Sequence, residues 1–402
     1  MIELEAALQQ ILAAIPAPLS ERIRWEDGHE RILAEPIFSS IDLPVFDNSA
    51  MDGYAVRAAD VTPAKPEAPV RLRLRGRIAA GETFTGELAV GECIRVFTGS
   101  LLPRGADAVV MQEETRTDAD QPSDVLILSS AMPLENVRLR GEDIERGTML
   151  AEAGEVVTTG KINLCAAVGV TEMSVGKRPT VGLLATGSEL REAGHPLSPG
   201  QIYECNRIGM AMLSRRVGAT PKIFPLIPDT LAATQMALEQ AFSECDVVVT
   251  SGGVSVGEMD FVKTAFERLG GKLWFWKVSI RPGRPFVFGE RGGKFLFGLP
   301  GNPASALVTF LLLVRPALLR WQGARDVALP AHPGMLTDPL ANPGERRHLM
   351  RVRVDAAGNV FPAGLQASHA LSSMAAANGL VDVPAQTTLA AGTTIRVMRW
   401  DW

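Results

Sequence analysis

Hydrophobic residues recur in different patterns along the chain, and each pattern predicts a different kind of structure. Leu4, Leu8 and Ile11 are spaced as on one face of a helix, and Pro16 ends the segment, which predicts an N-terminal helix. Between about residues 46 and 145, apolar and polar residues mostly alternate, and Gly or Pro interrupts them at short intervals. This second pattern is typical of short antiparallel strands.

From about residue 178 to residue 326, short apolar runs alternate with helical stretches. The apolar runs predict buried strands at residues 181–185, 223–227, 247–250 and 295–299. The stretches between and after them predict helices at residues 208–217, 231–242, 261–269 and 304–319. Strands that alternate with helices of this length indicate right-handed βαβ units and a mostly parallel sheet. Asp229-Thr230 and Asn302-Pro303 are suitable start signals for two of these helices.

The helical period disappears after about residue 326. Met350, Val352 and Val354 alternate with arginines, and residues 355–359 have the composition of a hairpin turn. Another short run, at residues 394–398, predicts a final strand. The C-terminal part of the chain is therefore expected to be a small β domain.

The composition excludes several classes of function. The 402 residues carry a net charge of −5, and such a mildly acidic chain lacks the basic footprint of a nucleic-acid-binding protein. The longest apolar run, residues 306–314, is too short to span a membrane, and the N-terminus has no basic segment of a signal peptide. The four cysteines are widely spaced and form no C-x-x-C pair, which favours free thiols in the reducing cytoplasm over a zinc site.

Three strands of the predicted α/β region end in glycine-rich turns, at residues 185–190, 250–260 and 298–304. Ligands of open α/β sheets bind beyond the carboxyl ends of the strands, where glycines let backbone N–H groups approach an anion. Glycines at one such turn need only allow a tight turn. Three turns at the same end of one sheet favour a site for an anionic ligand.

Charged residues surround the same predicted crevice. Glu189, Asp229 and Asp260 each follow a strand, and carboxylates together with phosphate oxygens are the usual ligands of Mg²⁺. The alternative for each acid is a role at a helix N-terminus, and for Asp229 this alternative is at least as strong. Lys277 and Arg281 lie in a Pro-rich turn with Arg284, and such cations suit an oxyanion substrate.

One segment also matches the nucleophile elbow of serine hydrolases. Gly253-Val-Ser255-Val-Gly257 fits the pattern G-x-S-x-G between a strand and a helix. Two further small residues precede the match, and Glu258 and Asp260 add negative charge where a hydrolase needs an oxyanion hole. The pattern therefore favours an anion cradle over a hydrolase. The sequence contains neither a P-loop motif nor a Rossmann motif.

Seven segments together carry a resemblance to a known family. FDNSAMDGYAVR, TGSLLPRGADAVVMQEE, RLRGEDI, LATGSEL, TSGGVSVGEMDFVK, IRPGRPFVFG and GLPGNPASA occur in this order over most of the chain. The chain resembles the molybdopterin molybdenumtransferases of molybdenum-cofactor biosynthesis and the C-terminal half of gephyrin. The LATGSEL, SGGVSVG and GLPGNP segments alone are less specific, because competence-damage-type proteins share that domain.

The resemblance implies a multidomain α/β plus β fold with four parts. These are an elongated N-terminal domain (1–45 and 146–177), an inserted β domain (46–145), a molybdopterin-binding α/β domain (178–326) and a C-terminal β-barrel-like domain (327–402). It also implies a homodimer in which the inserted domain of one subunit completes the active site of the other. The implied reaction inserts molybdenum from molybdate into adenylylated molybdopterin, with Mg²⁺-assisted release of AMP. Expected partners are a molybdopterin-adenylylating protein and molybdoenzyme maturation factors.

The resemblance also assigns site residues by motif. Those expected to face the cleft from the partner subunit are Asp52, Thr98, Arg138 and Asp143. Those expected to serve metal and substrate are Glu189, Asp229 and Asp260. The glycine-rich loops contribute Gly187, Ser251, Gly252, Gly253, Ser255, Pro300, Gly301 and Asn302. Those expected to bind the oxyanion or the cofactor from other segments are Lys277, Arg281, Arg351 and Ser368.

This chain departs from the family pattern at a few positions. Ser188 stands where the family usually has an acid, and Arg281 and Arg284 stand where it often has lysines. Two other functions compete with the transferase. A non-catalytic scaffold has no need for the acids Glu189, Asp229 and Asp260 at one rim, and a phosphohydrolase of the competence-damage type has no need for the inserted domain.

Overall fold

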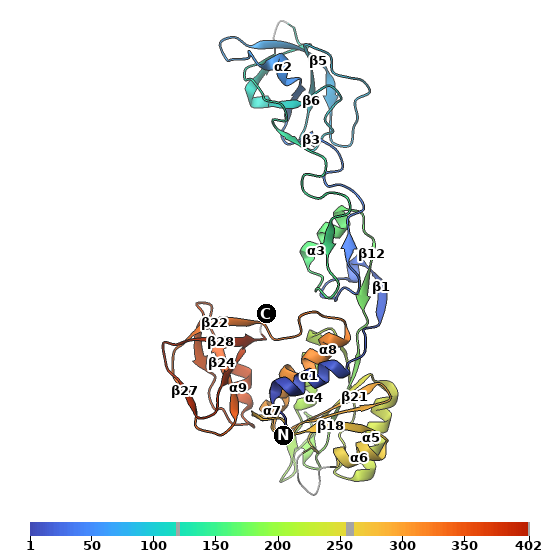
Figure 1. Cartoon of the computed structure of the whole chain (residues 1–402), viewed down its shortest axis with the longest axis vertical. Helices are drawn as coiled ribbons and strands as arrows, with labels where there is room; N and C mark the ends of the chain where they lie inside the picture. Colours follow the sequence, from blue (N-terminus) through green and yellow to red (C-terminus); the bar gives the residue numbers. More distant parts are fainter. Residues whose placement is uncertain (118–120, 255–260, 401–402) are drawn as a thin grey trace.

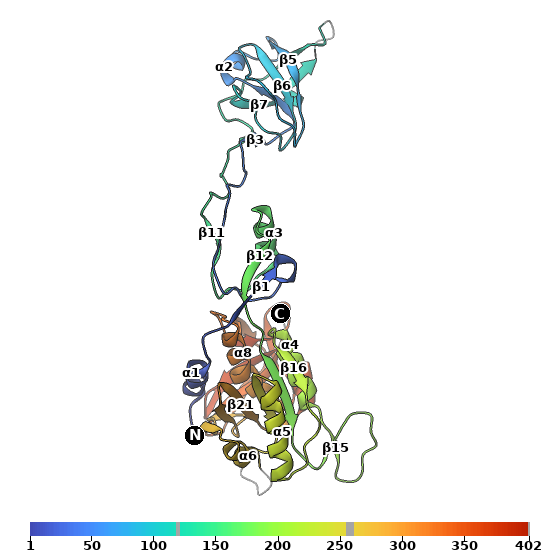
Figure 2. The same ribbon diagram turned by 90° about the vertical axis from the view of Figure 1, so that its right-hand side faces the viewer.

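The computed structural model describes residues 1–117, 121–254 and 261–400, and its units are arranged in an extended shape (Figures 1 and 2). The sheet that contains β5 and β6 lies at one end of the molecule. The α/β unit and the C-terminal β unit lie at the other end. Two passes of the chain, which include β1, β12 and β11, run between these ends as a stalk.

The predicted N-terminal helix is present as α1 (Leu4–Ala14), and its Leu4, Ala7 and Ile11 are buried in the core of the α/β unit. The stalk that follows consists of three antiparallel pairs of short strands. These are β1 (Ser20–Arg24) with β12 (Glu172–Gly176), β2 (Ile37–Phe38) with β11 (Met149–Ala151), and β3 (Asn48–Ser49) with β10 (Val137–Arg138). Helix α3 (Thr159–Ala167) packs beside these strands.

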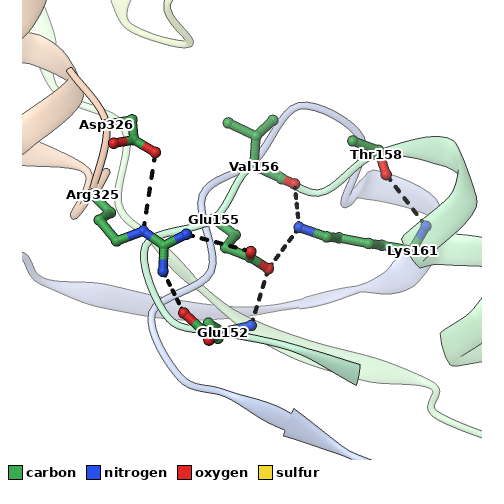
Figure 3. Close-up of polar contacts among 7 residues, drawn as sticks. All are labelled: Glu152, Glu155, Val156, Thr158, Lys161, Arg325 and Asp326. Atoms are coloured by element: carbon green, nitrogen blue, oxygen red, sulfur yellow. Dashed lines mark hydrogen bonds and ion pairs between the residues drawn. The ribbon is translucent and has the colours of Figure 1, made fainter. Parts of the chain in front are cut away.

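Ion pairs fix the base of the stalk to the segment that follows the last helix of the α/β unit (Figure 3). The Arg325 guanidinium pairs with the carboxylates of Glu152 and Glu155, and the Arg325 N–H donates to the Gly154 carbonyl oxygen at 3.0 Å. Lys161 Nζ donates to Glu155 Oε2 at 2.7 Å. These contacts join the stalk to the linker that leads into the C-terminal unit.

The inserted unit is a six-stranded sheet in the order β7-β4-β6-β5-β9-β8, with a short helix α2 (Ala58–Val61). Its strands are β4 (Gly53–Val56), β5 (Val70–Ile78), β6 (Glu92–Val96), β7 (Ala108–Met111), β8 (Thr115–Thr117) and β9 (Asp124–Ile127). The prediction of short strands is confirmed, but the antiparallel pairing is wrong for β5 and β6, which run parallel. The long connection between them crosses over instead of forming a tight turn.

The α/β unit contains the mostly parallel sheet that the sequence predicts, in the order β16-β13-β17-β21-β20-β18. The parallel strands are β16 (Thr220–Ile223), β13 (Thr180–Ala185), β17 (Val247–Ser251) and β21 (Lys294–Leu299). The antiparallel strands at one edge are β20 (Val287–Arg291) and β18 (Lys272–Trp276). The strand predicted at residues 223–227 is displaced: β16 spans Thr220–Ile223, and it ends before Pro225, which has no N–H for the ladder.

Helices cover the sheet as predicted. They are α4 (Asn206–Arg216), α5 (Leu231–Glu244), α6 (Val262–Arg268), α7 (Pro303–Thr309) and α8 (Arg315–Trp321), with a π-helical turn (Phe310–Val314) between the last two. In the described residues, the stretch Pro303–Trp321 is long and apolar enough to cross a membrane, but 78% of it is buried inside the molecule. It is therefore a core helix. Two short strands, β14 (Leu190–Arg191) and β15 (Ile202–Tyr203), belong to an excursion that extends from the unit in Figure 2.

The C-terminal unit is a small barrel. Its strands are β22 (Ala331–Leu336), β23 (Leu340–Asn342), β24 (Arg347–Val354), β25 (Asn359–Pro362), β26 (Gly379–Val383), β27 (Thr387–Leu389) and β28 (Thr394–Arg399), with one helix α9 (Leu371–Ala376). Five of them close a ring, because the sheet order β24-β25-β22-β28-β26 is completed by pairing of β26 with β24. The α/β unit adds β19 (Ile280–Arg281) to this sheet, so the two units share one seam.

Candidate active site

A cleft of about 990 Å³ lies at the carboxyl ends of β13, β17 and β21, where the α/β unit meets the barrel. The predicted site residues that line it are Gly187, Glu189, Asp229, Ser251, Gly252, Gly253, Arg281, Pro300, Gly301, Asn302 and Ser368. The three glycine-rich turns therefore converge on one site, as their sequence positions predict. Ser255 and Asp260 lie outside the described residues.

The glycine-rich turns pack closely against one another. Gly252 and Gly253 have φ values of +85° and +68°, and a Cβ at Gly252 would lie 2.7 Å from the Thr186 carbonyl oxygen. Asn206 Nδ2 donates to Ser251 Oγ at 2.6 Å and to the Gly301 carbonyl oxygen at 2.8 Å, so it ties two turns together. Asn206 is not predictable from the sequence, because a polar residue at the start of a helix carries no signal of such a tertiary contact.

The acids at the rim are held by local hydrogen bonds. Asp229 Oδ2 accepts the Ser188 N–H at 2.7 Å, and the Asp229 N–H donates to Ser188 Oγ at 3.2 Å. Thr230, not Asp229, caps helix α5, because its hydroxyl accepts the Ala233 N–H. The carboxylates of Glu189 and Asp229 both border the cleft. Over residues 1–117, 121–254 and 261–400, no group of three His, Cys, Asp or Glu side chains is placed to hold a metal ion.

Three guanidinium groups border the cleft at the seam between the units: Arg281, Arg284 and Arg346. Arg346 comes from the barrel, and its Nη1 donates to the Ile280 carbonyl oxygen at 3.1 Å. Burial lowers the pKa of Arg346, and the charges of Arg284 and Arg281 lower it further. In the part of the chain that the structure describes, none of the three has a carboxylate within 4.0 Å. The wall is therefore positive and lacks a neutralising partner there.

Lys277 is placed differently from the expectation. Its Nζ lies 3.9 Å from the ring centroid of Trp276, and the residue is not among those that line the cleft. Its backbone has a φ of +74°. The structure thus brings Arg281 together with Arg284 and Arg346, and it turns the Lys277 ammonium group onto an indole ring.

The barrel contributes Ser368 directly and Arg351 indirectly. Ser368 Oγ accepts from Asn302 Nδ2 at 3.1 Å. Arg351 is fully buried and does not line the cleft, although its alternation with apolar residues in the sequence is compatible with an exposed face. Its guanidinium donates to Ser373 Oγ at 2.8 Å and to the carbonyl oxygens of Leu365 and Ala367.

The residues expected from the inserted unit lie far from this cleft in the same chain. Asp52 Oδ1 accepts both the backbone N–H and the hydroxyl of Thr98, each at 2.8 Å, and these bonds hold the pKa of Asp52 below its usual value. Arg138 and Asp143 are exposed beside the short pair of β3 and β10. Figure 1 shows β3 and β6 at the end of the molecule opposite the α/β unit.

Comparison of the sequence with models of known protein families defines the class of the α/β unit. Residues 182–320 match the family model "Probable molybdopterin binding domain". Residues 2–169 match the model of the MoeA N-terminal region (domain I and II), and residues 333–400 match the MoeA C-terminal region (domain IV). The chain therefore belongs to the MoeA family, and it is a transferase of molybdenum-cofactor biosynthesis.

Individual relatives agree. A molybdopterin molybdenumtransferase of Haemophilus influenzae is 37% identical over 83% of this chain and 80% of its own length. Molybdopterin molybdenumtransferase 2 of Mycobacterium tuberculosis is 40% identical over 92% of both chains. Crystal structures of the molybdopterin biosynthesis MoeA protein from Pyrococcus horikoshii superpose over 100% of both chains with a TM-score of 0.86, at 33% and 28% identity. The relatives' shared name favours the transferase over the scaffold and the phosphohydrolase.

Proposed function

We propose that the cleft is where molybdenum from molybdate enters adenylylated molybdopterin and AMP leaves. The observation that carries this proposal is the positive wall of Arg281, Arg284 and Arg346 in the same cleft as three glycine-rich turns. Among the described residues these three guanidinium groups have no carboxylate within 4.0 Å, and the charges of Arg281 and Arg284 disfavour that of Arg346, so a bound oxyanion would reduce the repulsion. Molybdate is a small dianion of the kind that suits this wall.

The glycine-rich turns suit the other substrate. Gly187, Gly252, Gly253 and Gly301 line the same space, and glycine-rich turns of this type bind phosphate groups. The N–H groups of Gly187 and Gly252 donate to the carbonyl oxygens of Ile227 and Leu299, so Gly253 and Gly301 are the proposed phosphate donors. Adenylylated molybdopterin is itself anionic, so molybdate approaches it against like-charge repulsion. The arginines lower the cost of that approach, and the chain thereby supplies orientation and electrostatic stabilisation rather than a covalent intermediate.

The rim acids fit a magnesium ion. Mg²⁺ prefers one or two carboxylates together with substrate phosphates and water, and Glu189 and Asp229 are two carboxylates beside the phosphate-binding turns. Asp229 Oδ2 accepts the Ser188 N–H, which orients the carboxylate and leaves its other oxygen for a metal. Asp260 is the third expected ligand. Bound Mg²⁺ supplies polarisation of the phosphoanhydride, and Glu189 and Asp229 hold it beside the turns.

The position of the inserted unit supports a shared active site. Asp52 and Thr98 lie in the inserted unit, and Arg138 and Asp143 lie in or beside β10 at the adjoining end of the stalk. Figure 1 shows β3, the partner of β10, and β6 at the end of the molecule opposite the α/β unit. In a homodimer with antiparallel stalks, these residues reach the cleft of the partner subunit. The proposed setting is the cytoplasm, consistent with the four free cysteines, and the proposed partners are a molybdopterin-adenylylating protein and molybdoenzyme maturation factors.

The test is an assay of AMP release by the purified protein with adenylylated molybdopterin, Mg²⁺ and molybdate. The proposal expects AMP release that requires all three, and a loss of activity on Arg284→Ala or Arg346→Ala. Arg291→Ala is the matched control, because Arg291 lies in β20 outside the cleft. Wild-type activity of both cleft variants would exclude the arginine wall from the reaction.

A further inference from the structure

Residues 365–368 form a loop of the barrel unit that contacts the α/β unit beside the cleft. Ser368 Oγ accepts from Asn302 Nδ2 at 3.1 Å, and the Ser368 carbonyl oxygen accepts the Ala304 N–H at 3.1 Å. Asn302 is the N-cap residue of α7, yet its side chain makes no cap bond. The barrel therefore supplies the acceptor for the first turn of this helix, and α9, which follows the loop, packs against α7.

The loop has no regular secondary structure of its own, and residues Arg351 and Gln366 fix its position. Gln366 Oε1 accepts the Arg351 backbone N–H at 2.9 Å, and Gln366 Nε2 donates to the Arg351 carbonyl oxygen at 2.9 Å. The Arg351 guanidinium donates to the carbonyl oxygens of Leu365 at 2.9 Å and Ala367 at 3.0 Å. Strand β24 thus holds the loop through both the backbone and the side chain of one residue.

Arg351 is a costly residue at this place. Its side chain is fully buried, its Nη1 has no hydrogen-bond partner, and no carboxylate within the described ranges lies within 4.0 Å of it. A buried cation without an anionic partner is less favourable than an apolar side chain of similar volume. Its hydrogen bonds to Leu365 and Ala367 account for its presence, because an apolar side chain cannot make them.

We propose that Arg351 and Gln366 are positioning residues for the transferase reaction. They hold residues 365–368 so that Ser368 contacts Asn302, and so keep the barrel wall of the cleft at the distance that adenylylated molybdopterin requires. Gln366 borders the cleft, but both its amide hydrogens are used, one by Arg351 and one by the Gly364 carbonyl oxygen. This inference rests on the proposed placement of the reaction in the cleft.

The test compares Gln366→Leu with Gln240→Leu, in which the same change is made on the exposed face of α5. Hydrogen exchange of the Ala304 amide reports the contact with Ser368. We expect exchange at least about tenfold faster in Gln366→Leu, because two hydrogen bonds to β24 are lost. The KM for adenylylated molybdopterin should rise roughly threefold to thirtyfold, while kcat changes less than about twofold. The Gln240→Leu control should match the wild type in both measurements.

A second pair, Arg351→Met and Arg353→Met, removes a guanidinium from two positions of the same strand. Arg353 is exposed and lies over the Phe361 ring, so its loss should leave the KM unchanged. The inference is overturned if the Ala304 amide of Gln366→Leu exchanges at the wild-type rate. It is also overturned if that amide exchanges faster while the KM for adenylylated molybdopterin stays at the wild-type value. Arg281→Ala is measured in parallel: if that variant also keeps wild-type kinetics, the placement of the reaction in the cleft has failed, and not the positioning role alone.

Discussion

Replacing Arg281 by Ala tests the proposed anion site at the seam between the two units. Arg281 lies in β19 directly opposite His348 of β24, and its side chain lines the cleft with Arg284 and Arg346. The change removes one full charge from a wall of three and leaves the glycine-rich turns unaltered. The expected defect is therefore specific to the oxyanion.

The magnitude follows from the kind of contact that is lost. A hydrogen bond to a charged group contributes about 1.5–3 kcal/mol, so the molybdate affinity should fall roughly tenfold to a hundredfold. Arg281→Lys keeps the charge and should restore most of the affinity, although a lysine does not fork its donors. The affinity for adenylylated molybdopterin should change much less, because the turns at Gly187, Gly252 and Gly301 hold it.

A second signal shows whether the charge at Arg281 has been removed from a folded site. Burial lowers the pKa of His348 to about 4, and the charges of Arg281 and Arg351 contribute to this shift. In Arg281→Ala the pKa of His348 should rise toward its ordinary value, and NMR titration of the imidazole measures it. Burial is the largest cause of the shift, so a loss of structure would return the pKa of His348 to 6.5. Loss of the Arg281 charge alone should raise the pKa by less, so a raised pKa that stays below 6.5 indicates a folded seam without the charge.

The assay is AMP release as a function of molybdate concentration for the wild type, Arg281→Ala and Arg281→Lys. The half-saturating molybdate concentration should be raised in Arg281→Ala and should partly recover in Arg281→Lys. If Arg281→Ala shows the wild-type molybdate dependence while the pKa of His348 has risen but stays below 6.5, the anion site lies elsewhere.

Four further predictions follow from other parts of the molecule. Asp229→Ala should slow AMP release at least about tenfold without unfolding the protein, because Thr230 caps α5; equal rates would remove Asp229 from the site. Mixed dimers of Asp52→Ala and Asp229→Ala subunits should regain part of the activity that each variant lacks alone, and no recovery in verified heterodimers would contradict a shared site. Arg325→Gln removes the ion pairs to Glu152 and Glu155 and should broaden the range of stalk orientations relative to the α/β unit, which small-angle X-ray scattering measures. An unchanged scattering profile would show that these ion pairs do not set the orientation of the stalk. His348 is buried and its pKa falls from 6.5 to about 4 on folding, so the stability that it contributes is present above pH 6.5 and is lost as the pH falls toward 4. In urea unfolding between these pH values, the free energy of unfolding of His348→Phe should fall by about 3 kcal/mol less than that of the wild type. Equal losses of unfolding free energy would contradict the assignment.

The sequence predicts the local elements well, because their signals are local. The spacing of Leu4, Leu8 and Ile11 determines the face that α1 buries, and the apolar run at 247–250 becomes the central strand β17. The convergence of the glycine-rich turns is also predictable, since parallel strands end at one edge of a sheet. The parallel pairing of β5 and β6 is not, because strand signals carry no direction.

The site is only partly predictable, for a different reason. Arg346 joins Arg281 at the cleft because β24 of the barrel pairs with β19 of the α/β unit, and no local pattern encodes that seam. Arg351 alternates with apolar neighbours as an exposed residue would, yet the loop at 365–368 covers it. Lys277 has the charge for an oxyanion site, but its backbone conformation and Trp276 direct the ammonium group elsewhere.

AMP release from adenylylated molybdopterin, measured with and without molybdate at saturating Mg²⁺, shows whether the cleft carries out the transferase reaction. The purified protein should release AMP in step with insertion of molybdenum, and omission of molybdate should greatly slow the release. Release of AMP at the same rate without molybdate would indicate a phosphohydrolase. No release with all components present would contradict the placement of the transferase reaction in this cleft.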